Sequence, residues 1–266
     1  MSAPLLARML LDAIEEFGRA VEHVPPPGRG GSIGRLNAAS WVVAHAASPL
    51  DFGLNVYCQG LERDGWLAEW AAQRRGAGEP APDPPFSEAR EAFERVAERA
   101  AHYLQSCDEA SLAVPPAAER SPGTSALTNV PPGPLVARNV AHLFVHAGEL
   151  SVIASLLARG DLGLPGALWR STGTGHEAVE PADGRRPTAV AMLLDARKQF
   201  ARVADAVPVP AQAGAFARLS SGGWIVTHCA QQDDQDWNVA AQRLEPDAWL
   251  AASSVHAEAE PPRASA

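Results

Sequence analysis

The stretch Asn139-Val-Ala-His142-Leu-Phe-Val-His146-Ala-Gly-Glu149-Leu150 has apolar residues at the spacing of an α-helix. Its two histidines are four residues apart, so on a helix they lie one turn apart on one face and their imidazoles can converge on one ion. Asn139 and Glu149 fall on the same face, each three residues from a histidine. Imidazole is the commonest side-chain ligand of metals such as zinc and nickel. The stretch therefore predicts a helix that supplies part of a metal site.

A third histidine, His45, lies in the apolar segment Ala39-Ser-Trp-Val-Val-Ala-His45-Ala-Ala, which also has helical spacing. Three histidines with an open fourth position are typical of a catalytic zinc site rather than a closed structural one. A lone histidine on a helix is more often hydrogen-bonded and inert. The pair together with the third histidine favours a metal centre, and the predicted ligands are His45, His142 and His146.

Glu149, one turn beyond His146, is the candidate catalytic residue. It could act as the general base for metal-bound water, serve as a fourth ligand, or orient His146 through a hydrogen bond. It could also be a carboxylate that is bonded elsewhere on the helix face. The sequence leaves these roles open.

The composition excludes several classes of protein. The chain has 266 residues with a formal net charge of -9 and a pI near 5.4, whereas a nucleic-acid surface needs a basic stripe. No apolar run approaches the length of a membrane span, and the amphipathic N-terminus is not a signal peptide. The three cysteines are widely spaced and odd in number, which favours free thiols in a reducing compartment. We expect a cytoplasmic protein with no membrane or nucleic-acid partner.

The chain contains an internal duplication, in which residues 5–61 recur as residues 188–244. Aligning the two segments without a gap gives 22 identities in 57 positions. The segment Trp41-Val-Val-Ala-His45 recurs as Trp224-Ile-Val-Thr-His228. The second copy lacks any H-x-x-x-H downstream, so it cannot assemble a three-histidine site alone. We interpret it as a duplicated helical hairpin that packs on the preceding bundle, with His228 outside the metal site.

The apolar spacing predicts an all-α protein. A four-helix bundle fills residues 1–160, and an additional C-terminal two-helix hairpin fills residues 185–252. A linker at 161–184 joins them, and residues 253–266 form a disordered tail. The bundle helices are predicted at 4–23, 37–60, 87–107 and 134–159, with a long crossover at 108–133, and the hairpin helices at 187–206 and 220–243.

A histidine in the second helix with H-x-x-x-H-A-G-E-L in the fourth resembles the DinB-like superfamily. This group includes the thiol-dependent S-transferases that use mycothiol or bacillithiol and the mycothiol-dependent maleylpyruvate isomerases. The resemblance covers residues 4–160 and places the metal triad on His45, His142 and His146. It implies zinc or nickel as the divalent ion, with a low-molecular-weight thiol such as mycothiol or a substrate in the open position. It also implies that dimers are common.

These features favour a metal-dependent transferase or isomerase that acts on a small electrophilic molecule with the help of a thiol. One alternative is a hydrolase that uses metal-bound hydroxide, with Glu149 as the base. Another is a non-catalytic metal-binding or ligand-binding stress protein. The expected partner is a small-molecule substrate, and the chain is expected to be a monomer or homodimer.

Overall fold

The computed structural model describes residues 3–34, 36–73, 81–116, 129–157, 188–207 and 222–257. Every regular element within these ranges is helical, which confirms the predicted all-α class for this part of the chain. The chain divides into two compact units, residues 1–192 and 193–266. The predicted linker at 161–184 lies outside the described residues. None of the described helices is long and apolar enough to cross a membrane.

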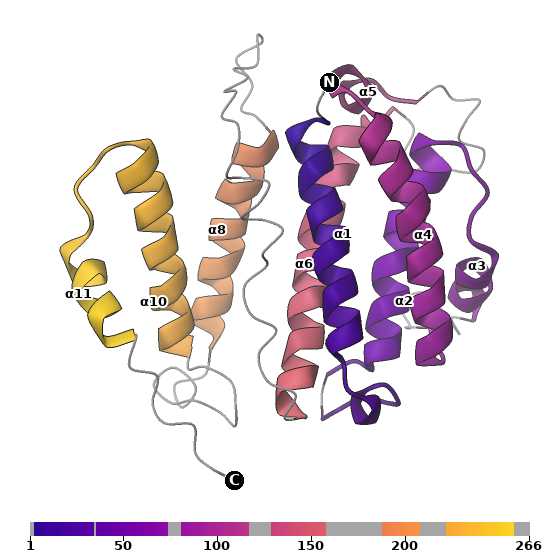
Figure 1. Ribbon diagram of the computed structural model, residues 1–266, viewed down its shortest axis with the longest axis horizontal. Helices are drawn as coiled ribbons and strands as arrows, with labels where there is room; N and C mark the ends of the chain where they lie inside the picture. Colours follow the sequence, from indigo (N-terminus) through magenta and orange to yellow (C-terminus); the bar gives the residue numbers. More distant parts are fainter. Residues whose placement is uncertain are drawn as a thin grey trace. The chain divides into compact units, whose positions relative to one another are not determined.

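Four helices of the first unit share one apolar core (Figure 1). They are α1 (Leu5–His23), α2 (Ala39–Leu50), α4 (Phe86–Ser106) and α6 (Pro132–Leu156). Helix α1 packs against α6 and α4, and α2 packs against α4 and α6. The first two helices therefore lie diagonally across the core instead of forming the packed hairpin that the sequence suggested. Their apolar faces are covered by the two later helices.

The hydrogen bonds across the core fix the helix directions. Asn55, just beyond α2, donates to the Val96 carbonyl of α4, and Gln59 donates to the Arg99 carbonyl one turn further along. Because both positions advance together, α2 and α4 run parallel. Two parallel neighbours need a connection that returns along the length of the unit, and residues 59–85 supply it.

The long connection predicted at 108–133 lies between α4 and α6, and its described residues include a short helix, α5 (Glu109–Ala113), capped by Asp108. Residues 117–128 of it lie outside the described part of the chain. The connection between η2 and α4 contains the helix α3 (Gly65–Ala72), which was not predicted from the sequence. A 3₁₀ turn, η1 (Pro26–Gly28), follows the C-terminal end of α1.

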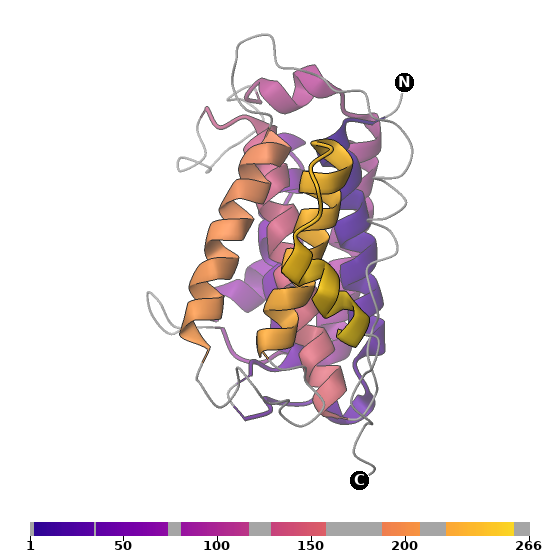
Figure 2. The same ribbon diagram turned by 90° about the vertical axis from the view of Figure 1, so that its left-hand side faces the viewer.

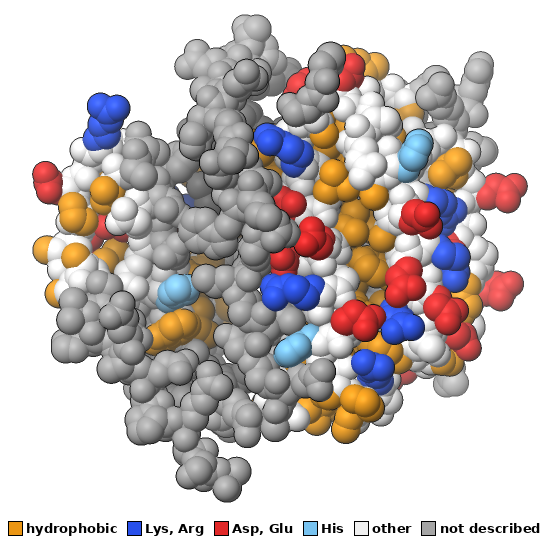
Figure 3. Space-filling view, viewed as in Figure 1, with side chains coloured by type: hydrophobic (Ala, Val, Ile, Leu, Met, Phe, Trp, Pro, Cys, Tyr) orange, Lys and Arg blue, Asp and Glu red, His pale blue; other side chains and the backbone are white. Residues whose placement is uncertain are grey.

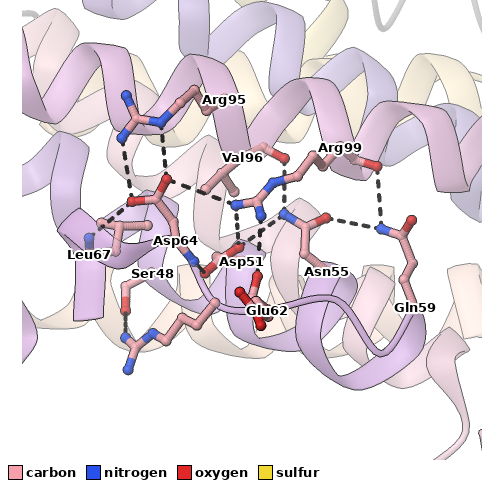
Figure 4. Close-up of polar contacts among 11 residues, drawn as sticks. Ser48, Asp51, Asn55, Gln59, Glu62, Asp64, Leu67, Arg95, Val96 and Arg99 are labelled. Atoms are coloured by element: carbon pink, nitrogen blue, oxygen red, sulfur yellow. Dashed lines mark hydrogen bonds and ion pairs between the residues drawn. The ribbon is translucent and has the colours of Figure 1, made fainter. Parts of the chain in front are cut away.

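The predicted helix 37–60 is divided in two. Helix α2 ends at Leu50, and a π-helix, η2 (Asp51–Cys58), continues it. The side chain of Asp51 accepts hydrogen bonds from Asn55 and from the backbone N–H of Asp64, which leads into α3. These contacts hold the end of η2 and the start of α3 together (Figure 4).

The described residues from 188 onward, most of which belong to the second unit, repeat these elements in the alignment that the sequence gives. Helix α8 (Thr188–Ala206) corresponds to α1, α10 (Gly222–Asp233) to α2, and the π-helix η5 (Asp234–Ala241) to η2, and both bounds of each element align with those of its counterpart. Helix α11 (Ala248–Ala257) begins at the position that aligns with the start of α3, and it packs against α10 (Figures 1 and 2). The duplication thus extends past residue 244.

The tail was expected to be disordered from Ser253, but α11 continues to Ala257. Its first turn is capped by Asp247, whose side chain accepts hydrogen bonds from the backbone N–H groups of Trp249 and Leu250. A cap of this kind satisfies amides that the helix itself leaves unpaired, and so it stabilises the helix start. Residues 258–266 lie outside the described part.

Candidate metal centre

The three predicted ligands lie together in the core of the first unit. His45 comes from α2, and His142 and His146 come from adjacent turns of α6. The Nε2 atom of His142 lies 3.2 Å from Nε2 of His45 and 3.1 Å from Nε2 of His146. All three ligand atoms lie within 4.8 Å of one another. Two helices far apart in sequence thus bring three imidazole nitrogens to one point.

This spacing fits a divalent ion. Zinc binds imidazole nitrogen at roughly 2.0–2.1 Å, so two nitrogens of a tetrahedral site lie about 3.3 Å apart and those of an octahedral site about 2.9 Å. The two nitrogen–nitrogen distances of 3.1 and 3.2 Å fall between these values. The donor set is all imidazole, which suits zinc, nickel and copper better than magnesium or calcium.

The protonation of His142 also suits a ligand. Burial lowers its pKa to about 4, and electrostatic repulsion from the neighbouring His146, His45 and Arg138 side chains lowers it further. A neutral imidazole is the form that binds metal ions. His142 is therefore ready to bind at neutral pH without first losing a proton.

A carboxylate orients His146. Its Nδ1 atom lies 2.9 Å from Oε2 of Glu149, and Oε1 of Glu149 accepts a 2.9 Å hydrogen bond from the Asn37 side chain. The two ring nitrogens point in different directions, so the carboxylate lies away from the point where the Nε2 atoms converge. A hydrogen bond at Nδ1 fixes the tautomer that leaves the Nε2 lone pair free for a metal.

Trp41 packs on the third ligand. Its ring is stacked on that of His45, with centroids 4.5 Å apart and planes at 12°. The sequence predicts Trp41 as a core residue, but neither this contact nor the role of Asn37 was predicted from it. The signal for Trp41 was its position four residues before His45, on the same helix face. Asn37 lies 112 residues from Glu149, and nothing in the sequence pairs them.

His228, the counterpart of His45, has the same local geometry without the other ligands. Trp224 stacks on it with centroids 4.9 Å apart and planes at 7°. Within the described residues, His45, His142 and His146 form the one group of three or more side chains that could hold a metal ion. His228 does not belong to it.

The chain matches no protein-family model, no curated protein and no solved structure.

Proposed function

We propose that this chain is a metal-dependent enzyme of the DinB-like type, a transferase or isomerase that acts on a small electrophilic molecule with the help of a low-molecular-weight thiol such as mycothiol. The observation that carries the proposal is the convergence of three Nε2 atoms from α2 and α6. The arrangement of α1, α2, α4 and α6 round one core, with the ligands on the second and fourth of them, supports a DinB-like bundle. A zinc or nickel ion held there would lower the pKa of a bound thiol and keep it as a thiolate.

The chain's own cysteines in this unit are poor nucleophiles, which supports an external thiol. Burial raises the pKa of Cys58 to about 12, and burial also raises the pKa of Cys107. Both side chains are buried. A thiol stays protonated far below its pKa, and the protonated form is a weak nucleophile.

We propose that Glu149 is a positioning residue that acts through His146, rather than the base of a hydrolase. Both of its oxygens are engaged, one by His146 and one by Asn37. Replacing such a hydrogen-bond partner of a metal ligand typically weakens metal binding about 10- to 100-fold. Glu149→Gln should therefore weaken metal binding by this factor and leave the pH profile of turnover unchanged. If Glu149 were instead a general base, its replacement would remove one limb of the pH profile of turnover and leave metal affinity unchanged.

The first experiment is elemental analysis of the purified protein. We expect about one divalent ion per chain, and His146→Ala should lose stoichiometric metal while His102→Ala, a histidine outside the cluster, keeps it. The metal-loaded protein would then be screened with mycothiol, bacillithiol and glutathione against small electrophiles. Turnover that depends on both thiol and metal supports the proposal. Unchanged metal content in His146→Ala contradicts the site, and bound metal without any thiol-dependent turnover contradicts the activity.

A further inference from the structure

In the first unit, α4 is held by a set of polar side chains at the end of α2. We name Asp51, Asn55, Gln59 and Asp64 the first polar cluster. Two arginines on α4 bind its carboxylates: Arg99 donates to Asp51 at 3.0 Å and Arg95 donates to Asp64 at 3.0 Å (Figure 4). The two amide side chains donate to backbone carbonyls of α4. Every member of the cluster thus contacts either α4 or another member.

The contact with α4 buries the cluster. The Asp51 and Asn55 side chains are fully buried and Asp64 is 8% exposed. Burial alone would raise the pKa of Asp64, but the hydrogen bond and charge of Arg95, the Leu67 N–H and the charge of Arg99 together lower it. The arginines of α4 therefore favour the charged form of Asp64 within this buried cluster.

The second unit reproduces the acceptor half of this arrangement. We name Asp234, Asn238, Gln242 and Asp247 the second polar cluster. The Asn238 side chain donates to Asp234 at 2.8 Å, where Asn55 donates to Asp51 at 3.1 Å. The Asp247 backbone N–H donates to the other oxygen of Asp234 at 2.9 Å, the same distance as in the first cluster. The hydrogen bonds from Asn238 and from the Asp247 N–H hold the pKa of Asp234 below its ordinary value.

Among the described residues of the second unit, no helix takes the place that α4 has beside the first polar cluster. None of them supplies an arginine to Asp234 or Asp247, and Asp247 is exposed where its counterpart is buried. The neighbouring apolar positions are open as well. Val42 and Val43 are fully buried by the first unit, whereas Ile225 and Val226 are 41% and 39% exposed. Apolar side chains lie at the surface of the second unit in Figure 3.

We infer that the second polar cluster and the apolar face of α10 form a docking site for an amphipathic helix that carries two arginines four residues apart, as α4 does. The second unit offers the complementary chemistry, because two carboxylates, placed as those that bind Arg95 and Arg99, lie next to exposed apolar side chains. Opposite charges that meet in this way set the register of a bound helix. An amphipathic helix in an apolar groove is a common mode of recognition.

A second copy of α8 is a poor occupant of this site. The basic pair Lys198 and Arg202 has the right spacing, but each is two residues from Phe200, the counterpart of a core position. Residues two apart on a helix point to opposite sides, so this pair faces away from the apolar stripe. On α4, by contrast, Arg99 lies one turn from the buried Val96.

The test uses a fluorescent peptide of residues 84–107, which contains α4, added to the full-length protein. We expect saturable binding with one peptide per chain. The first-unit site does not compete, because its own tethered α4 is present at a far higher effective concentration. Asp234→Asn with Asp247→Asn should weaken binding at least about tenfold, while Glu245→Gln, which removes one negative charge between the two positions, should leave it unchanged.

A second arm keeps the protein wild-type, because changes at Asp234 could disturb η5 itself. A peptide with Arg95→Gln and Arg99→Gln should bind at least about tenfold more weakly than the native peptide. Equal binding of the two peptides overturns the proposal. The absence of binding to the wild-type chain also overturns the proposal. It would mean that the first unit or a second copy already covers the apolar face of α10. Sedimentation of the Ile225→Asp variant then distinguishes those two occupants, because only loss of a dimer lowers the mass.

Discussion

Two segments of this protein share a local structure but differ in what surrounds them. Residues 5–72 and residues 188–255 fold into equivalent helices in the same order and with the same spacing along the chain. Yet Phe17 is fully buried while its counterpart Phe200 is 37% exposed, and Ala20 is 1% exposed while Val203 is 65% exposed. The repeated sequence thus specifies helices and caps. Burial depends on α4 and α6, which cover the first segment.

The same difference separates the two histidines. His45 and His228 each stack against a tryptophan one turn earlier, with nearly the same geometry. Only His45 lies next to the histidines of α6. A shared local motif is therefore not enough to give a metal ligand, because the site also needs two further nitrogens from another helix.

The largest expected effect concerns these two histidines. Binding free energies of protein zinc sites are on the order of 10–16 kcal/mol, so the loss of one of three ligands should weaken binding about a thousandfold. His45→Gln should therefore release the metal, whereas His228→Gln should retain it. Titration with zinc against a competing chelator measures both. If His228→Gln loses the metal as fully as His45→Gln, the two repeats build the site jointly and the comparison fails.

A smaller effect is expected at the two phenylalanines. Phe17 packs against Phe93 of α4, with ring centroids 4.8 Å apart. Replacing a fully buried phenylalanine by alanine costs about 3–5 kcal/mol, while a largely exposed one costs under about 1 kcal/mol. Phe17→Ala should therefore speed hydrogen exchange in α1 by about a hundredfold or more, and Phe200→Ala should change exchange in α8 only slightly. Equal effects would mean that Phe200 is buried against a partner in solution.

The sequence was sufficient to predict the long helices and the histidine cluster. Apolar spacing located α1, α4 and α6 within a few residues, and the i, i+4 pair with His45 gave the three histidines that the structure brings together. These features depend on local periodicity and on chemistry that is specific to histidine. Contacts between distant residues were not predictable in the same way. Arg99 could be seen only as part of a charged helix face, because Asp51 lies 48 residues away.

The two repeats together indicate which residues cause the π-helix. Pro49 stands in the last turn of α2 and could be taken as the cause of the change after Leu50, because proline disrupts helical hydrogen bonding. In the second repeat Gln232 occupies the equivalent position, and η5 forms all the same. The polar residues that both π-helices share are the aspartate and asparagine of the polar clusters. We therefore attribute the π-helices to these polar side chains rather than to proline.

The smallest expected effect concerns Arg95 and Arg99, which bind the first polar cluster and have no counterpart at the second cluster among the described residues. Because the contacts with Arg95 lower the pKa of Asp64 below 3.8 in the folded state, its charge stabilises the protein above that value. This contribution is lost as the pH falls through the lowered pKa, where the carboxylate takes up a proton in the folded state too. Asp64→Asn should therefore lower the Tm of the metal-free protein at pH 6, and by less at pH 3.5. Glu62→Gln, which changes an exposed carboxylate in the same loop, should show no such pH-dependent difference in Tm.

The Tm deficit of Asp64→Asn could instead stay constant with pH. That result would mean that the N-cap hydrogen bond that Asp64 accepts from the Leu67 N–H stabilises the protein more than the arginines do. The second repeat has the equivalent hydrogen bond, from Leu250 to Asp247.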